Sequence, residues 1–188
     1  MLQDATVSHM IHATGFFSNN YGFVMREIGT MPVHPAWRYQ PPYLAHFITK
    51  MLEPAKHLFP DAYMRYQTYV DNTLVEWNSG QDDMLSIVQS LQSGMRPGQT
   101  IYCISPLLAG IFQIMFPRTH VFDIHDMGCE DLTQYPYRRW TCPFIKHRQP
   151  EPGVCVLPVI SRMREWYYTE LVTESESESE SAESGIEA

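Results

Sequence analysis

The stretch VSHMIHATGFF-SNNY-GFVMREIGT, residues 7–30, decides the fold. Its two outer segments, residues 7–17 and 22–30, are rich in apolar, aromatic and β-branched residues, which is typical of strands. The residues between them, 18–21, include the serine and asparagines that favour a turn. We therefore predict that the chain opens with two consecutive strands of a sheet.

Downstream of this stretch, the sequence predicts alternating helices and strands. Asp82 or Asp83 is suited to cap a helix that ends at Gly94. The other predicted elements are a helix over 43–58 that Pro54 kinks or divides, strands over 63–70, 100–104 and 120–124, a helix over 107–116, an extended stretch over 154–157 and a helix over 160–171. This order predicts a small α/β domain. No GxGxxG motif follows any predicted strand, which argues against a dinucleotide-binding site.

Charge divides the chain into a body and a tail. The 188 residues carry a net charge of −8, and six glutamates lie in residues 173–188, so the body carries only −2. We predict one domain over residues 1–172 and a disordered acidic Glu/Ser tail over 173–188. The tail is interpreted as solubilising, or as a set of acid-directed serine phosphorylation sites. A nearly neutral body argues against a broad basic face for duplex DNA.

The sequence has neither a long apolar run nor a recognisable secretion signal. We therefore expect no membrane association and an intracellular protein, cytoplasmic or nuclear. In a reducing compartment, its four cysteines are expected as buried thiols or metal ligands. Cys103, within an apolar predicted strand, is expected in the core.

A run of cysteines and histidines suggests a zinc site. Its spacing is His125-x3-Cys129-x12-Cys142-x4-His147-x7-Cys155, which gives five candidates for the four places of a tetrahedral site. We favour Cys129, Cys142, His147 and Cys155 as ligands, with His125 as the alternate. The zinc would be structural and would stabilise a loop. The other interpretation is buried thiols and an ordinary core histidine.

One locally cationic stretch overlaps this run. Basic and aromatic residues are interleaved there, a pattern suited to binding RNA through charge and base stacking. The candidate nucleic-acid-binding residues are Arg138, Arg139, Trp140, Lys146 and Arg148. The other interpretation is the surface of a zinc loop.

The opening segments resemble the first two strands of RNase H-like exonucleases of the DEDDh family. Those proteins carry an Asp-x-Glu-Thr-Thr-Gly motif, and often Glu-Ile-Gly-Ala on the next strand. Here Thr14-Gly15 and Glu27-Ile28-Gly29 match, whereas the two catalytic acids fall on Met10 and His12. The resemblance implies an RNase H-like mixed sheet flanked by helices.

The later region resembles the Maelstrom domain, a divergent RNase H-like relative, and related open reading frames of animal viruses and mobile elements. The similar segments are Thr100–Cys103, Val121–Cys129, Cys142–Phe144 with His147, and Cys155–Leu157. Maelstrom domains carry a Glu-His-His-Cys constellation associated with zinc. His147 and Cys155 fit its closing His and Cys, whereas the sequence does not place its Glu and first His.

The resemblance implies a loss of catalytic acids. In the family the last helix supplies a His and an Asp, but Pro158–Thr169 contains Glu165 and neither of those. Glu27, Asp123 and Asp126 remain as candidate catalytic acids, which would need magnesium. The other interpretation is structural, with Glu27 beside Arg26 and the two aspartates as caps.

The sequence therefore predicts a catalytically degenerate, zinc-stabilised module that binds single-stranded RNA or a protein partner. One alternative is an active single-strand nuclease with non-standard acids. Another is a virus- or transposon-encoded interaction protein on the same fold.

Overall fold

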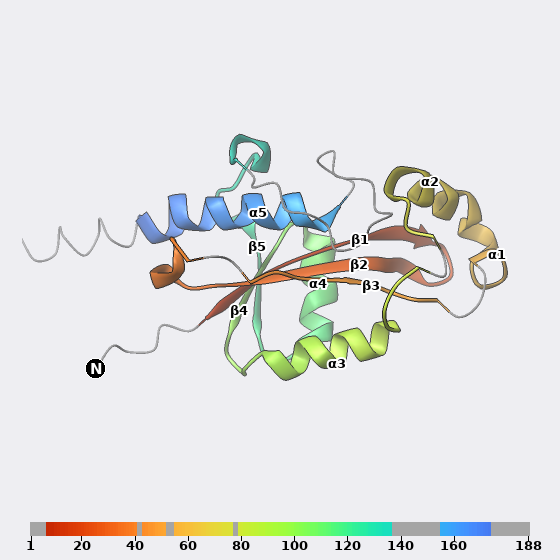
Figure 1. The fold of residues 1–188 in the computed structure, drawn as a ribbon, viewed down its shortest axis with the longest axis horizontal. Helices are drawn as coiled ribbons and strands as arrows, with labels where there is room; N and C mark the ends of the chain where they lie inside the picture. Colours follow the sequence, from red (N-terminus) through yellow and green to blue (C-terminus); the bar gives the residue numbers. More distant parts are fainter. Residues whose placement is uncertain (1–6, 41–42, 52–54, 77–78, 137–154, 174–188) are drawn as a thin grey trace, which may run out of the picture.

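A computed structural model describes residues 7–40, 43–51, 55–76, 79–136 and 155–173. These residues form an α/β structure with a five-stranded mixed sheet and helices on both of its faces (Figure 1). The strands are β1 Ser8–Ser18, β2 Gly22–Val33, β3 Ala45–Ile48, β4 Thr100–Cys103 and β5 His120–Asp123. The α-helices are α1 Ala55–Leu58, α2 Tyr63–Thr73, α3 Met84–Gly94, α4 Pro106–Met115 and α5 Val156–Trp166, which a π-helical turn, Tyr167–Leu171, extends.

The strand order is β3-β2-β1-β4-β5. The first three strands pair antiparallel, whereas β4 and β5 run parallel to β1. The predicted opening hairpin is confirmed, and its register pairs Thr14 with Glu27 and His12 with Gly29. A bulge follows Thr14, where a Cβ on Gly15 would overlap the Val24 carbonyl, so the two backbones can approach only because residue 15 is glycine.

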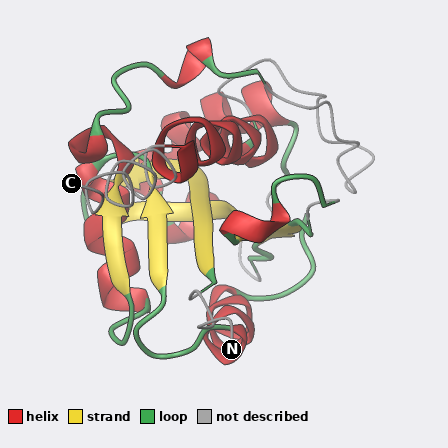
Figure 2. Ribbon diagram, turned by 90° about the vertical axis from the view of Figure 1, so that its left-hand side faces the viewer, coloured by secondary structure: helices red, strands yellow, loops and turns green. Residues whose placement is uncertain are grey.

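Side chains of the sheet alternate between two faces, and each face has its own core. Met10 and Met31 point toward α5, whereas Ile11 and Ile28 pack with α3 and α4. Figure 2 shows the strands, in yellow, with helices on either side. A third cluster around Phe16 joins the tip of the hairpin to α1 and α2. The described residues thus form one core on each face of the sheet and a third at the tip of the hairpin.

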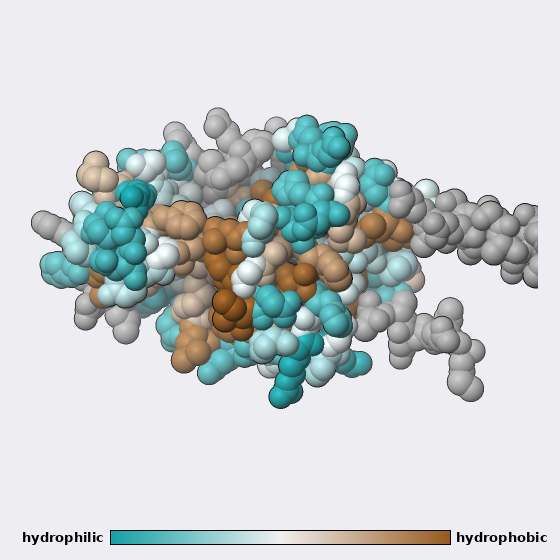
Figure 3. All heavy atoms as spheres, turned by 180° about the vertical axis from the view of Figure 1, so that it is seen from behind, coloured by the Kyte–Doolittle hydropathy of each residue, from teal (hydrophilic) through white to brown (hydrophobic). Residues whose placement is uncertain are grey.

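The helix predicted to end at Gly94 is confirmed. Asp83 is its N-cap, because its Oδ1 accepts a hydrogen bond from the Ser86 backbone N–H at 2.9 Å. The next helix, α4, leaves Leu107 and Ile114 exposed. Figure 3, seen from behind, shows apolar side chains gathered near the middle of this side of the molecule.

Three predicted elements differ from the structure. Most of the predicted helix over 43–58 is not helical, because β3 instead supplies hydrogen bonds to the edge of β2. The predicted strand over 63–70 is part of α2, whose tyrosines at 63, 66 and 69 have helical spacing. The extended stretch over 154–157 is also wrong in part, because α5 begins at Val156 with Cys155 as its N-cap.

Among the described residues, no helix is both long and apolar enough to cross a membrane.

Candidate metal centre

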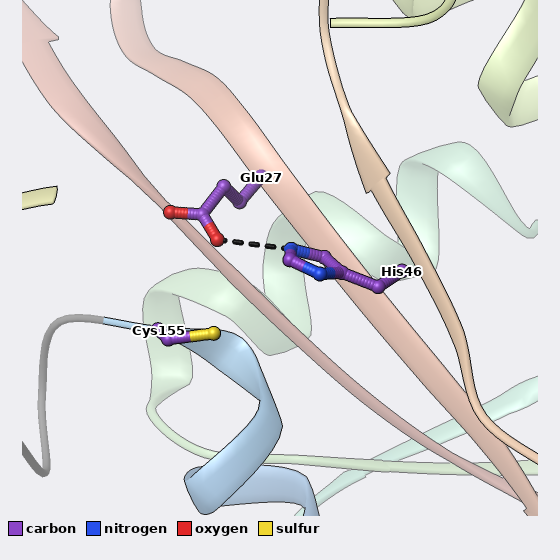
Figure 4. Close-up of side chains that lie close together, drawn as sticks. All are labelled: Glu27, His46 and Cys155. Atoms are coloured by element: carbon purple, nitrogen blue, oxygen red, sulfur yellow. Dashed lines mark hydrogen bonds and ion pairs between the residues drawn. The ribbon is translucent and has the colours of Figure 1, made fainter. Parts of the chain in front are cut away.

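Three buried side chains of metal-binding type meet on the α5 face of the sheet. Glu27 lies on β2 and His46 on β3, and Cys155 is the residue that precedes α5 (Figure 4). One carboxylate oxygen, one imidazole nitrogen and the sulfur all lie within 4.8 Å of one another. The three residues have exposures of 0%, 8% and 1%. We call them the Glu27–His46–Cys155 cluster.

Strand register and one glycine explain why these residues meet. Gly29 pairs with His46 on β3, and Glu27 lies two residues away on the same face of β2. A Cβ on Gly29 would lie 2.8 Å from Val156 Cγ2, so the missing side chain lets α5 approach the sheet closely. Cys155 immediately precedes Val156 and is thereby held against the two strands.

Glu27 is held by hydrogen bonds from three other elements. The hydroxyls of Thr14 and Tyr69 donate to Oε1 at 3.1 and 2.8 Å, and His46 Nε2 lies 3.0 Å from Oε2. Burial, with the nearby Glu27 carboxylate, raises the pKa of Tyr69 well above its usual value. The Tyr69 hydroxyl therefore stays protonated and donates a hydrogen bond to Glu27, and this bond fixes the orientation of the carboxylate.

A second histidine flanks the cluster. His12 on β1 pairs with Gly29 from the side opposite to His46. Burial lowers the pKa of His12 to about 4, although Glu27 opposes the shift, so the ring is neutral at pH 7. Its buried Nδ1 has no hydrogen-bond partner among the described residues. A neutral imidazole nitrogen is a metal ligand as well as a hydrogen-bonding group.

The donor set of the cluster fits zinc. Zinc binds thiolate, imidazole and carboxylate at about 2.0–2.3 Å, usually in a tetrahedron of four ligands. Tetrahedral ligands at those lengths lie roughly 3.3–3.8 Å apart, so donor atoms already within 4.8 Å of one another need only small movements. The burial of all three residues is typical of a closed structural site.

The cluster contains one of the zinc ligands predicted from spacing, Cys155. Cys129 is fully buried in the apolar core below α5 but is not a member of the cluster. Burial raises its pKa to about 11, so Cys129 is a protonated thiol at neutral pH. His125 is partly exposed and its Nδ1 lies 3.0 Å from Asp123 Oδ1. Cys142 and His147 lie outside the described residues.

The candidate catalytic acids do not converge in the described part of the chain. Asp123 pairs with Cys103, which lies in the core under α4, and it accepts hydrogen bonds from the backbone N–H groups of Ser105 and His125. Glu27 is on the opposite face of the sheet, with β1 and β4 between the two strands. Asp126 is exposed. Asp123 is thus a structural cap, which was the alternative to a catalytic role in the sequence analysis.

Cys103 is a fully buried core residue, as predicted.

His46 is the one cluster residue that the sequence did not suggest, because the segment around it was predicted to be helical. A strand could have been recognised from the alternation of side chains over residues 45–48, in which positions 46 and 48 are the buried ones. The proposed RNA-contacting residues Arg138, Arg139, Trp140, Lys146 and Arg148 lie outside the described residues.

No protein-family model matches this chain, and no curated protein matches it. The site must therefore be interpreted from its own geometry.

Proposed function

We propose that this chain is an RNase H-like domain that binds one structural zinc ion through Glu27, His46, Cys155 and a fourth ligand. The observation that carries the proposal is the convergence of three buried donor side chains, of three chemical types, from three separate elements. A mixed sheet that opens on an antiparallel hairpin and has helices on both faces supports the RNase H-like part.

His147 is our proposed fourth ligand. In chain order, Glu27, His46, His147 and Cys155 give Glu-His-His-Cys, the order that the resemblance to the Maelstrom domain implies. His147 is eight residues before Cys155 in the sequence. His12 is the competing fourth ligand, because it pairs with Gly29 beside the cluster and its buried Nδ1 has no hydrogen-bond partner among the described residues.

We further propose that the domain is a binding module without two-metal nuclease activity. Such nucleases need several carboxylates around two ions about 3.5–4 Å apart. Met10, at one of the acid positions of the family motif, is fully buried in the apolar core. Glu165 on α5 is paired with Arg164 at 3.1 Å. Glu27 alone cannot hold two metal ions.

Single-stranded RNA is the partner that the sequence favours for this module, through Arg138, Arg139 and Trp140. We expect binding that weakens steeply with salt, because contacts to phosphates release counterions. A protein partner becomes the preferred ligand if labelled RNA does not bind at low salt.

Metal analysis of the purified full chain tests the zinc site. We expect about one zinc per chain in wild type, and little in His46→Ala or His147→Ala. Cys129→Ala is the matched control, since it removes a buried cysteine outside the cluster. Loss of zinc in Cys129→Ala with full zinc in His46→Ala would contradict the proposed ligand set. Zinc lost in His12→Ala but kept in His147→Ala assigns the fourth position to His12.

Incubation with labelled single-stranded RNA and magnesium tests the absence of catalysis. We expect wild type and Glu27→Gln to leave the RNA equally intact. Cleavage by wild type that Glu27→Gln abolishes would instead establish a nuclease with unusual acids.

Replacing Tyr69 by phenylalanine is expected to weaken zinc binding roughly 10-fold while the fold is kept. The aromatic ring stays in its apolar site near Phe16, but Glu27 loses its shortest described hydrogen bond. Competition with a zinc chelator measures the change in affinity. Tyr63→Phe, on the same helix and without a described hydrogen bond to Glu27, is the control; equal affinities in the two variants would rule out the orienting role.

A further inference from the structure

The face of the sheet opposite the metal cluster contains a hollow between the strands and α3. Its volume is about 730 Å³, within the range of small-molecule sites. Strands β1, β2 and β3 form its floor, and the C-terminal half of α3 with the loop after it forms a wall. The residues that matter below are His9, Thr30, Phe47, Arg96 and Gln99.

Thr30 supplies a buried polar group beside this cavity, without a hydrogen-bond partner among the described residues. Thr30 is one of the residues that line this cavity, and it is only 7% exposed. Its hydroxyl oxygen has no hydrogen-bond partner among the described residues. An unsatisfied buried hydroxyl costs about 1–3 kcal/mol, so its position in a cavity indicates a partner that comes from outside.

Two further polar groups have a defined orientation. Gln99 Oε1 accepts a hydrogen bond from the Arg96 backbone N–H at 2.8 Å and lies 3.3 Å from His9 Nε2. This arrangement leaves the Gln99 amide N–H₂ as a donor and, with His9 donating through Nε2, His9 Nδ1 as an acceptor. Burial lowers the pKa of His9, so the ring is neutral at pH 7. The cavity therefore combines an apolar lining with hydroxyl, amide and imidazole groups.

A cationic hollow adjoins this cavity. Its volume is about 310 Å³, it shares Met95 and Arg96 with the larger cavity, and Arg118 also lines it. Among the described residues, no aspartate or glutamate lines either hollow. Within the described part of the chain, neither arginine side chain forms an ion pair. Two guanidinium groups at one end, neither in an ion pair with a described residue, favour an anionic group, above all a phosphate.

We propose that these two hollows bind a nucleoside monophosphate unit. The base occupies the larger cavity beside the Phe47 ring, where its polar edge satisfies Thr30, Gln99 and His9. The phosphate occupies the smaller hollow between Arg96 and Arg118. A purely apolar ring would leave the Thr30 hydroxyl unsatisfied, so a heterocycle with donors and acceptors fits better. The unit is either a free nucleotide or the terminal nucleotide of an RNA.

Calorimetric titration of the zinc-loaded full chain with AMP, GMP, CMP and UMP tests this site. We expect saturable binding of at least one nucleotide, with a Kd on the order of 10–100 µM. Arg96→Gln is expected to weaken binding at least 10-fold. Lys50→Gln, which removes one exposed positive charge outside both hollows, is the matched control and is expected to leave binding unchanged.

Thr30→Val distinguishes a ligand-binding role of Thr30 from a structural one. Because the hydroxyl is buried and has no partner in the described part of the chain, its removal is expected to preserve or raise the Tm of the free protein while it weakens nucleotide binding about 5- to 10-fold. A structural role for Thr30 would instead lower the Tm. The zinc content of every variant is measured in parallel and is expected to stay at the wild-type level, because this site is on the other face of the sheet.

Short RNAs with and without a 5′-phosphate show whether the ligand is a free nucleotide or the terminal nucleotide of an RNA. Tighter binding of the phosphorylated RNA than of the free nucleotide, lost in Arg96→Gln, identifies an RNA end; the reverse order identifies a free nucleotide. No saturable binding up to about 5 mM of any nucleotide overturns the proposal. So does binding that Arg96→Gln and Thr30→Val leave intact, or binding that disappears only in His46→Ala, which would place the phosphate on the metal.

Discussion

Replacing Cys155 by alanine is expected to remove the zinc and to lower the stability of the domain by about 4 kcal/mol. For a chain of this size, that corresponds to a fall in Tm of roughly 8–16 °C. Cys155 is the N-cap of α5, and α5 covers the core on one face of the sheet. In the proposed site, zinc would therefore hold the start of this helix against β2 and β3. Without the metal, Glu27 remains buried with one partner fewer in its surroundings, which adds to the cost.

Calorimetry and metal analysis check this result together. Cys103→Ala is the control, because Cys103 is also fully buried but lies on the other face of the sheet. It is expected to lose stability through its cavity alone and to keep its zinc. Wild type stripped by a chelator is expected to melt like Cys155→Ala, and added zinc is expected to restore only wild type. A Cys155→Ala protein with full zinc and the Tm of Cys103→Ala would refute the role of this cysteine.

Replacing Gly29 by alanine is expected to cost about 2 kcal/mol, or roughly 4–8 °C in Tm. The added Cβ would lie 2.5 Å from Ile160 Cδ1 and 2.8 Å from Val156 Cγ2, closer than carbon atoms approach one another. Helix α5 must therefore move away from the sheet. Because Cys155 begins that helix, we also expect weaker zinc binding, although residue 29 carries no metal ligand.

A double-mutant cycle separates the steric clash with α5 from the general effect of replacing a glycine by alanine. Ile160→Val removes the closest atom, so it is expected to recover part of the stability that Gly29→Ala loses. Gly110→Ala is the matched control: it lies within α4 with nothing near its added Cβ, and is expected to gain about 0.5–1 kcal/mol. A Gly29→Ala protein as stable as wild type would show that α5 does not depend on this close approach.

Local patterns alone predicted much of the fold. The hairpin of β1 and β2 follows from two apolar, β-rich segments around a turn, and α3 follows from its Asp83 cap and its terminal Gly94. These elements were predictable because neighbouring residues determine them. The same holds for α4 and the main part of α5, whose apolar residues recur at helical spacing.

Local patterns failed where a partner distant in sequence decided the outcome. Residues 45–48 have a spacing compatible with a helix, yet they form β3 because the edge of β2 offers hydrogen bonds to an extended chain. Residues 63–70 were predicted as a strand, but burial of Tyr66 and Tyr69 against Phe16 selects a helix. In both places, tertiary contacts outweigh local propensity.

The sequence by itself determined that this chain is an α/β domain with an acidic terminal segment, and it identified Cys155 and Glu27 as residues of interest. Only the tertiary structure decided that these two residues meet, and that His46 meets them. Strand register and the close approach of α5 at Gly29 bring together side chains at positions 27, 46 and 155. No spacing rule contains that information, because a metal centre of this kind is defined by distances across a sheet and not by intervals along a chain.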